Sequence, residues 1–295
     1  MALESPVWFI TATSSGFGHE LALAALKLGH TVIATARDPS RIQDLADAGA
    51  HTIAFDVVSP YSTIEALAND LFVKFGRVDY LINAAGYLLI GAFEEVSPEE
   101  VYDSFNVNVF GAINTIRAFL PHMRAQAVAE NGIRATVATF GSIGGLKAHP
   151  SCGIYCMNKA CMSMLAETLK DEIQPFAMRA TVVEPGFFRT AFLNPNTRIK
   201  AKMQLEAYSD ERTPTGQIKQ ILSGADGKQP GNVEKGAAVL IDLLTGSVAN
   251  GTELPARIVL GTDCAQAIKA KCASDLKLLD EWADITKSTD YPQGQ

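Results

Sequence analysis

A regular alternation of short apolar runs with segments of helical periodicity constrains this chain more than any other feature. The first apolar run, 7–11, leads into a turn rich in small residues, 12–18, and then into a segment, 20–28, whose apolar side chains recur at helical spacing. A second β-rich run follows at 31–36. The chain therefore begins with a β-α-β unit, which is typical of an α/β protein with a parallel sheet.

The turn between the first strand and the first helix contains Gly16 and Gly18. Glycine lets the backbone approach an anion closely, and the free N–H groups and dipole of the following helix stabilise negative charge there. A β-α-β unit of about 30 residues has the size of a mononucleotide-binding unit, so a pyrophosphate is the anion we expect. Two glycines match G-x-G-x-x-G only in part, and an ordinary tight connection remains the alternative.

The residue after the second strand bears on which nucleotide is bound. In NAD-binding units this strand normally ends at an acid that holds the ribose hydroxyls, whereas here Ala36 is followed by Arg37. A guanidinium group suits a 2′-phosphate, which a carboxylate would repel. The pattern therefore favours NADP(H). Two alternatives stay open: Arg37 is a solvated loop charge, or its neighbour Asp38 reaches the ribose instead.

The alternation continues along the chain. The further strands that we expect lie at 51–55, 78–83, 134–140, 179–184 and 257–260, and the further helices at 64–75, 98–129 with an interruption near 106–111, from Ser151 onward, 233–245 and 264–286. Strands separated by helices predict a parallel sheet with helices on both faces. We therefore expect an α/β fold with one Rossmann-type, doubly wound sheet of about seven strands, in a single domain over 1–295.

Ligands of such sheets bind beyond the C-terminal ends of the strands. The segments and residues that follow the expected strands at this rim are 12–18, Arg37, Asp56, 83–86, Ser142 and 185–190. Each is a weak signal by itself, but all of them converge on one predicted site.

Tyr155 and Lys159 lie four residues apart in this region. If the segment from Ser151 onward is helical, this spacing places the phenol and the ammonium on one face of the helix. A cation beside a phenol favours the phenolate and lowers a pKa that starts near 10, which makes Tyr155 a usable acid or base. Ser142, at the end of a strand, can face this helix. The alternative is that the pair arises by chance.

Composition and charge exclude several classes of function. The net charge of -7 and the pI near 5.3 argue against a nucleic acid or an anionic membrane as the main partner, because both require a basic face. No run reaches the roughly 18 apolar residues of a membrane span, and the N-terminus lacks a basic region ahead of an apolar one. We therefore expect a cytoplasmic protein without a membrane span.

The cysteines and histidines do not form an obvious site. The five cysteines are an odd, sparsely placed set in a chain without a secretory signal, so we expect reduced thiols. Cys152 and Cys156 flank Tyr155, but buried cysteine usually behaves as a small apolar residue. The five histidines lie far apart without metal-ligand spacing, and we predict no metal.

The segment 191–232 departs from the alternating pattern. It contains prolines, polar clusters and only short helical patterns such as 199–208. A long irregular segment at the functional rim is more typical of a lid than of a linker. Its apolar side chains favour a bulky, mainly apolar substrate, although packing of the segment onto the core explains them equally well. We expect 191–232 to be a substrate-binding lid within the domain.

Several short motifs occur in one order along the chain. They are Thr11-x6-Gly18, Asp56, Asn83-Ala84-Ala85-Gly86, Asn108, Ser142, Tyr155-x-x-x-Lys159 and Pro185-Gly186. In this combination the chain resembles the short-chain dehydrogenase/reductase family, closely over roughly the first 190 residues and loosely beyond them. In Arg37 and in the length of the segment after Thr190, the chain resembles the hydroxysteroid and retinol dehydrogenase branch of the family, and also reductases of secondary metabolism.

The resemblance implies roles for the residues of these motifs. Tyr155 would be the general acid/base, Ser142 would bind the substrate oxygen, and Lys159 would hold the nicotinamide ribose and lower the pKa of the tyrosine. Asn108 would organise a helix irregularity and a water linked to Lys159. Asp56 would contact the adenine amine.

The resemblance also implies the residues around the two ligands. The expected NADP(H)-binding residues are Thr11, Ser14, Ser15, Gly16, Phe17, Gly18, Arg37, Asp56, Val57, Asn83, Ala84, Ala85, Gly86, Tyr155, Lys159, Pro185, Gly186, Phe188 and Thr190. The expected substrate-side residues are Leu146, His149, Pro150, Phe187 and Phe192. Homodimers or homotetramers formed through the helices around 101–124 and 155–176 are a further implication.

The sequence thus predicts an NADPH-dependent reductase of a ketone or aldehyde on a bulky, mostly apolar small molecule such as a steroid, retinoid or secondary metabolite. A non-redox enzyme of the same fold and a non-catalytic NADP(H)-binding protein are the alternatives. Two departures from the family pattern stand out. Ala12 replaces the first glycine of the turn, and Thr139-Phe-Gly-Ser142 replaces the usual Asn-x-Ser-Ser.

Overall fold

The computed structural model describes residues 5–194, 198–246 and 253–291. Its centre is a sheet of seven parallel strands in the order β11-β7-β6-β4-β1-β2-β3, which confirms the predicted fold class. The strands are β1 (Val7–Ile10), β2 (Thr31–Ala36), β3 (His51–Ala54), β4 (Tyr80–Asn83), β6 (Ala135–Phe140), β7 (Met178–Pro185) and β11 (Arg257–Leu260). The strand order reverses between β1 and β4, where open α/β sheets bind their ligands.

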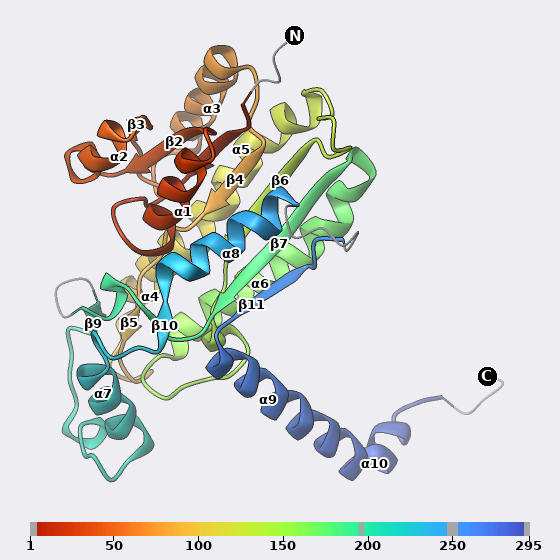
Figure 1. Ribbon diagram of the computed structural model, residues 1–295. Coiled ribbons are helices and arrows are strands. Elements are labelled where there is room, and N and C mark those ends of the chain that lie inside the picture. The colour runs from red at the N-terminus through yellow and green to blue at the C-terminus, as the bar shows by residue number, and fades with distance from the viewer. Residues whose placement is uncertain (1–4, 195–197, 247–252, 292–295) are drawn as a thin grey trace.

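Helices cover both faces of this sheet (Figure 1). α1 (Gly16–Lys27) and α8 (Val233–Thr245) pack against each other on one face. α3 (Tyr61–Phe75), α5 (Gly111–Ala125) and α6 (Gly153–Ile173) cover the other face. Since both faces are covered, the central strands are buried along their whole length. Their sequences are therefore mostly apolar and do not alternate between apolar and polar residues.

The predicted interruption of the helix after residue 98 is a π-helical turn. α4 (Pro98–Phe105) begins at a capping box, in which the Ser97 side chain accepts from the Glu100 backbone and the Glu100 side chain accepts from that of Ser97. The π-helical segment η2 (Asn106–Phe110) joins α4 to α5. Such single turns often occur at functional sites, and this one directs Asn108 into the interior.

The lid segment, residues 191–232, is attached to the body at two short strand pairs. Its elements are the 3₁₀ turn η5 (Ala191–Leu193), β9 (Ile199–Lys200), the 3₁₀ turn η6 (Glu206–Tyr208), α7 (Pro214–Gly224) and β10 (Gly231–Asn232). β9 pairs with β5 (Leu89–Ile90), and β10 pairs with β8 (Phe188–Arg189). Residues far apart in the sequence thereby hold the lid segment beside the rim of the sheet.

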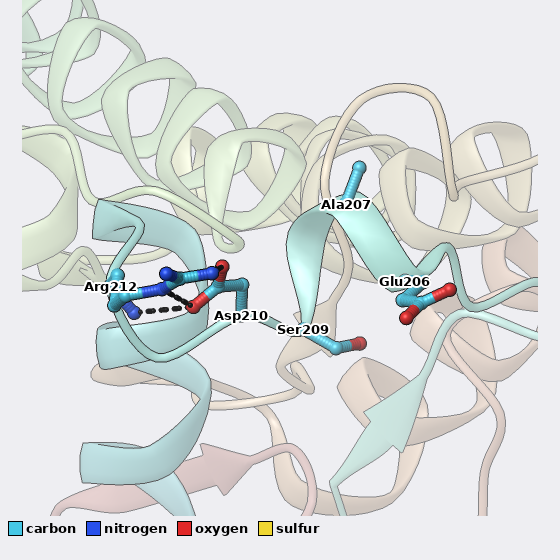
Figure 2. A pocket seen from close by; sticks show the side chains of 5 residues that line it. All are labelled: Glu206, Ala207, Ser209, Asp210 and Arg212. Carbon is cyan, nitrogen blue, oxygen red and sulfur yellow. Dashed lines mark hydrogen bonds and ion pairs between the residues drawn. The ribbon is translucent and has the colours of Figure 1, made fainter.

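An open hollow of about 590 Å³ lies on the lid segment (Figure 2). Its lining residues are Glu206, Ala207, Ser209, Asp210 and Arg212. Arg212 and Asp210 form an ion pair with each other across 2.7 Å, and none of the residues that the sequence places in a site lines this hollow. The predicted site residues lie elsewhere, at the rim of the sheet.

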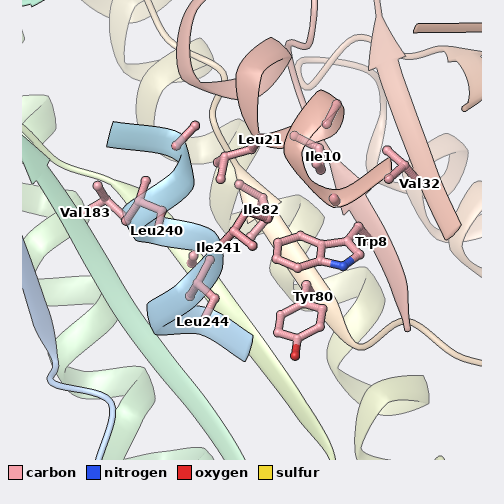
Figure 3. Packing of buried hydrophobic residues seen from close by; sticks show 14 of the residues in the cluster. Trp8, Ile10, Leu21, Val32, Tyr80, Ile82, Val183, Leu240, Ile241 and Leu244 are labelled. Carbon is pink, nitrogen blue, oxygen red and sulfur yellow. The ribbon is translucent and has the colours of Figure 1, made fainter. Parts of the chain in front are cut away.

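The core on the α1 and α8 side shows how the first and last thirds of the chain meet (Figure 3). Trp8 of β1 stacks on Tyr80 of β4 with ring centroids 4.0 Å apart. Leu21 of α1 and Leu240 of α8 are fully buried in the same cluster. α8 therefore fixes α1, and with it the end of the turn at residues 12–18, against the sheet.

Three local predictions were wrong. The helix expected from Ser151 onward begins only at Gly153, because the backbone of Ser151 is left-handed (φ 63°) and its hydroxyl donates to the Thr215 carbonyl of the lid segment. The pattern at 199–208 is not a helix, because β9 pairs with β5 and only η6 is helical. The predicted helix 264–286 is broken at Trp282 into α9 (Thr262–Glu281) and α10 (Ala283–Lys287).

Candidate active site

The rim of the sheet is held together by threonine side chains at the ends of β1 and β2. Thr11 is buried, and its hydroxyl accepts hydrogen bonds from the backbone N–H groups of Ala84 and Ala85, at 2.9 and 3.1 Å. The Thr13 hydroxyl donates to the Thr35 carbonyl. The end of β1 and the segment 83–86 after β4 are thus one connected unit, as their places on the rim predict.

The turn 12–18 fits a bound anion. The N-terminus of α1 has neither a side-chain cap at Ser15 nor an acidic residue in its first turn, so its first N–H groups face no competing carboxylate. A Cβ at Gly18 would lie 2.8 Å from the Ala12 carbonyl oxygen, so only glycine allows this approach. Gly16 is left-handed (φ 64°), and a Cβ added there would lie 3.6 Å from the side chain of Thr190.

Two expected members of this turn contribute differently. Ala12 adopts φ 56°, a left-handed conformation that favours glycine and is strained for alanine. The Phe17 ring packs between Phe140 and Phe188, with ring centroids 5.4 and 5.0 Å away, so its side chain belongs to the core. Only the backbone of Phe17 is therefore available to a ligand in the turn.

Of the two charged residues after β2, Asp38 is held by hydrogen bonds, whereas Arg37 is not in an ion pair with a described residue. The Asp38 carboxylate accepts from the hydroxyl and the backbone N–H of Ser40, and these bonds lower its pKa. Arg37 is exposed and forms no ion pair with the residues that the structure describes. The geometry thus leaves the guanidinium, and not the carboxylate, free for a ligand.

The ends of β3 and β4 carry the remaining residues expected near the adenosine. The Asp56 carboxylate accepts from the Val58 backbone, while the Val57 side chain is buried against Gly111 of α5. Asn83 is buried, and neither polar atom of its side chain has a partner among the described residues. An unpartnered buried amide is destabilising, so a water or a ligand group is expected there.

Tyr155 lies in the first turn of α6 and is almost fully buried. It forms a hydrogen bond with Ser142, whose hydroxyl also accepts from the Gly144 backbone at 3.1 Å. Burial raises the pKa of Tyr155 above its ordinary value, and the bond with Ser142 offsets only part of this effect. The lowered pKa expected from Lys159 is therefore wrong for this state of the protein.

Lys159 lies one turn further along α6, with its ammonium 5.6 Å from the centre of the Tyr155 ring. It is buried and donates to the Phe140 carbonyl at the end of β6, at 2.8 Å. Burial lowers the pKa of Lys159 to about 8. Burial thus disfavours the charged form of Lys159, just as it disfavours the phenolate form of Tyr155.

Asn108 and Gly86 complete the floor beside this lysine. The Asn108 carbonyl accepts from the Tyr87 backbone, and its amide donates to the carbonyls of Ser104 and Tyr87. A Cβ at Gly86 would lie 2.5 Å from the Asn108 carbonyl oxygen and 3.4 Å from the Lys159 nitrogen. The structure thus brings Asn108, Ser142, Tyr155 and Lys159 into one neighbourhood.

The other side of Tyr155 is apolar, and part of it comes from the lid segment. The Phe192 ring lies 5.8 Å from the tyrosine ring. Phe187 belongs to the same cluster, together with Leu193 and with Leu222 of α7. Leu222 was not among the predicted residues, because a leucine in a segment without clear periodicity gives no signal of where it packs.

The remaining predicted substrate residues lie on the loop between β6 and α6. Leu146 and His149 are half-buried, and Pro150 is exposed. The Nε2 atom of His149 is buried without a described partner, and burial lowers the pKa of this imidazole. Among these three residues, His149 is thus the one with an unsatisfied polar atom.

A buried ion pair that the sequence did not reveal attaches the lid segment. Lys219 of α7 donates to both carboxylate oxygens of Glu95, at 2.6 and 2.7 Å, and the Glu95 side chain has no exposed surface. Glu95 also accepts from the backbones of Ala92 and Leu205. Burial acts to raise the pKa of Glu95, but these bonds outweigh it and lower the pKa.

The cysteines beside Tyr155 are buried in the same apolar cluster. Burial raises the pKa of Cys152 to about 12 and also raises that of Cys156. Both are therefore neutral thiols at pH 7, which fits the prediction that they act as small apolar residues.

Within the described residues, no helix is long and apolar enough to cross a membrane.

Comparison with known proteins places the chain in a family. A sequence model described as short chain dehydrogenase matches residues 6–200, and the chain belongs to this family. A short-chain dehydrogenase from Streptomyces avermitilis shares 34% sequence identity over 97% of this chain and 99% of that chain, with a TM-score of 0.84. The family and the parallel sheet thus agree with the resemblance drawn from the motifs.

Curated relatives are oxidoreductases. Oxidoreductase BOA17 of Botryotinia fuckeliana is 28% identical over 95% of this chain and 97% of its own length. The 3-ketodihydrosphingosine reductase of Bacteroides thetaiotaomicron is 32% identical over 70% of this chain and 73% of its own length. The chain is therefore an oxidoreductase of this family, whose fold binds a nicotinamide cofactor.

Proposed function

We propose that this protein is an NADPH-dependent reductase of a ketone or aldehyde on a bulky, mostly apolar small molecule. The observation that carries the proposal is the surrounding of Tyr155, which has Ser142 and Lys159 on one side and the apolar side chains of the lid segment on the other. A relative that is named a 3-ketodihydrosphingosine reductase supports a substrate of this kind.

Bound NADPH would supply the hydride of such a reaction. Ser142 and Tyr155 orient the carbonyl oxygen of the substrate by hydrogen bonds, and the phenol of Tyr155 donates the proton to that oxygen. Because burial raises its pKa, the phenol is protonated at neutral pH, which is the form that reduction requires. Lys159 holds the ribose hydroxyls, and Asn108 fixes the backbone beside it.

The cofactor preference rests on Arg37. Its guanidinium is exposed, while the neighbouring Asp38 is engaged with Ser40, so a 2′-phosphate would meet a free cation. Arg37→Gln should weaken NADPH binding by roughly 10-fold or more, as expected for a bond to a charged group, and leave NADH binding unchanged. Titration calorimetry measures both affinities, and an equal effect on the two cofactors would contradict the preference.

The reaction is tested with purified protein, NADPH and a panel of steroid, retinoid and polyketide-like ketones. Oxidation of NADPH should accompany formation of the alcohol, and Tyr155→Phe should lower kcat by roughly 10²–10⁴-fold while NADPH still binds. Cys156→Ser, next along the helix, serves as a matched control and should remain active. Equal turnover by the phenylalanine variant would refute the mechanism, and product formation without NADPH consumption would point to non-redox chemistry.

Location and assembly are further proposals. We infer a cytoplasmic protein, which is supported by five free cysteines, and a fluorescent fusion would test this.

We also infer homo-oligomers formed through α5 and α6, because Phe110, Ile113, Met157 and Met164 are exposed apolar residues at or on these helices. The mass of a Met164→Asp variant in solution would test that surface.

A further inference from the structure

The segment that follows β7, residues 186–190, connects two parts of the candidate site. At one end, a Cβ added at Gly16, in the turn before α1, would lie 3.6 Å from the side chain of Thr190. At the other end, Phe187 packs on the apolar cluster that contains Tyr155. A dinucleotide with its pyrophosphate at that turn and its reactive ring beside the tyrosine must therefore pass along this segment.

Both backbone groups of Phe187 are held by residues from far along the chain. Its N–H donates to the Oδ2 atom of Asp263, at 2.7 Å, and its carbonyl accepts from the N–H of Gly231, at 2.9 Å. Asp263 lies in the first turn of α9, and Gly231 begins β10. Both residues lie beyond 6–200, the range that the family model matches, so the family motifs assign neither of them a role.

The Asp263 carboxylate continues the pairing of β7 with β11 by one more hydrogen bond. The N–H of Gly186 donates to the carbonyl of Leu260, the last residue of β11, at 2.8 Å. The next N–H, that of Phe187, meets no further strand residue, because β11 ends there and α9 begins. A backbone N–H needs an acceptor, and the side chain of Asp263 supplies it.

The carboxylate fits into a space that two glycines leave open. A Cβ added at Gly186 would lie 2.1 Å from the Oδ1 atom of Asp263, and one added at Gly261 would lie 2.5 Å from the same atom. Neither position can therefore carry a side chain while Asp263 stays in place. A glutamate, which is longer by one methylene group, cannot place its carboxylate at the same point without moving its neighbours.

The start of α9 belongs to the wall of the site, although the rest of the helix does not. Figure 1 shows α9 beginning at the end of β11 and leading away from the sheet. Cys264, next to Asp263, is the only residue of α9 that is buried. The helix also contacts the 3₁₀ turn η3 (Ile143–Gly145), which directly follows Ser142.

We propose that Asp263 is a positioning residue of the reaction, whose carboxylate fixes the backbone of Phe187 and thereby holds the segment 186–190 along the nicotinamide half of the cofactor. The inference rests on the proposed function, because it requires a nicotinamide beside Tyr155. The acceptor oxygen of Asp263, and not its charge, carries this role. Its partner is a neutral N–H group, and the carboxylate forms no ion pair within the described part of the chain.

The first experiment compares NADPH with adenosine 2′,5′-bisphosphate, which lacks the nicotinamide half. Titration calorimetry of the full-length protein measures both affinities. Asp263→Ala should weaken NADPH binding by roughly 3- to 10-fold, as expected when a hydrogen bond to a charged group is lost, and leave binding of the bisphosphate unchanged. The matched control is Asp280→Ala, an exposed acid on the same helix, which should bind both ligands like the wild type.

Two further variants separate the acceptor oxygen from the charge. Asp263→Asn keeps an acceptor of the same reach and should bind NADPH nearly as well as the wild type. Asp263→Glu keeps the charge but does not fit, so it should weaken NADPH binding as much as Asp263→Ala. With a substrate from the panel, the single-turnover rate of hydride transfer at saturating NADPH should follow the same order, because a loosened segment orients the ring less well.

The outcomes separate this inference from the proposed function. A wild type that binds neither ligand would overturn the proposed function and this inference with it. If the wild type binds NADPH, the inference alone is overturned by wild-type NADPH affinity in Asp263→Ala or by equal weakening of both ligands. An Asp263→Glu variant that binds NADPH better than Asp263→Asn would also overturn it, and this order decides even where Asp263→Ala does not fold.

Discussion

The two sides of Tyr155 are held in place in different ways. On the sheet side, Ser142, Lys159 and Asn108 are fixed by hydrogen bonds to backbone groups of the strand ends and their loops. On the lid side, the neighbours are apolar, and the segment that supplies Phe192, Leu193 and Leu222 is attached through Glu95 and Lys219, which lie far apart in the sequence. The residues proposed for catalysis thus depend on nearby strand ends and loops, whereas the apolar side of Tyr155 depends on contacts between distant parts of the chain.

The largest expected effect lies on the sheet side. Lys159→Met should lower kcat by roughly 10²–10⁴-fold, because it removes the cation between Tyr155 and the expected ribose site. Steady-state kinetics with a substrate found in the panel would measure this. Lys147→Met, an exposed lysine on the loop before α6, is the control and should keep its activity.

The same variant should gain stability. Burial lowers the pKa of Lys159 from 10.5 to about 8, so the charged form is disfavoured in the folded protein. This destabilisation is fully present below pH 8 and disappears as the pH rises toward 10.5. Lys159→Met should therefore raise the free energy of unfolding at pH 7 by on the order of 3 kcal/mol, and the advantage should shrink at pH 10. An advantage that grew with pH would contradict the assignment.

The next largest effect concerns attachment of the lid segment. Lys219→Met leaves the fully buried Glu95 carboxylate without its cation and should weaken the attachment by roughly 3 kcal/mol. KM for an apolar substrate should rise, and protease cleavage within 203–213 should accelerate, while NADPH affinity stays constant. Lys219→Arg should rescue both readouts. Lys228→Met, an exposed lysine of the same segment, is the matched control.

A smaller change tests the apolar wall alone. Phe192→Ala removes the ring that lies 5.8 Å from Tyr155. It should lower kcat/KM for bulky substrates by roughly 10-fold, the effect of a lost apolar contact, and leave small aldehydes unaffected. Met203→Ala, which is exposed on the lid segment, is the comparison. An equal loss for small and bulky substrates would mean that Phe192 serves catalysis and not selection.

The smallest effect belongs to the turn on the sheet side. Ala12→Gly relieves the left-handed strain at φ 56° and should stabilise the protein by about 0.5 kcal/mol, after the greater freedom of glycine in the unfolded chain is subtracted. Thermal unfolding measures the change. Ala24→Gly, in the middle of α1, should have the opposite sign. Destabilisation by Ala12→Gly would show that the alanine methyl group packs favourably.

The difference between the two sides also explains what could be predicted from the sequence. The ranges of α8 and β11 agree with the prediction at both ends, since periodicity and burial on the sheet set them locally. The helix expected from Ser151 onward begins instead at Gly153, because the Ser151 hydroxyl bonds to Thr215, which lies in the lid segment.

Electrostatic detail was equally hard to predict. The spacing of Tyr155 and Lys159 placed them correctly on one helix, yet the direction of the tyrosine pKa was wrong, because burial of both groups outweighs their proximity. The Glu95 and Lys219 pair has no sequence signature at all. A motif therefore identifies which residues meet, whereas the surrounding packing decides their charge state.

The pairing of β8 with β10 has a consequence for how proteins of this type can diversify. It fixes the two ends of the lid segment side by side, so the residues between them form a closed loop on a rigid base. Doubling the length of such a loop costs only about 0.6 kcal/mol of closure entropy. Insertions and deletions between Thr190 and Gly231 should therefore cost the sheet little stability, and the surroundings of Tyr155 on this side can change while the strand ends stay the same.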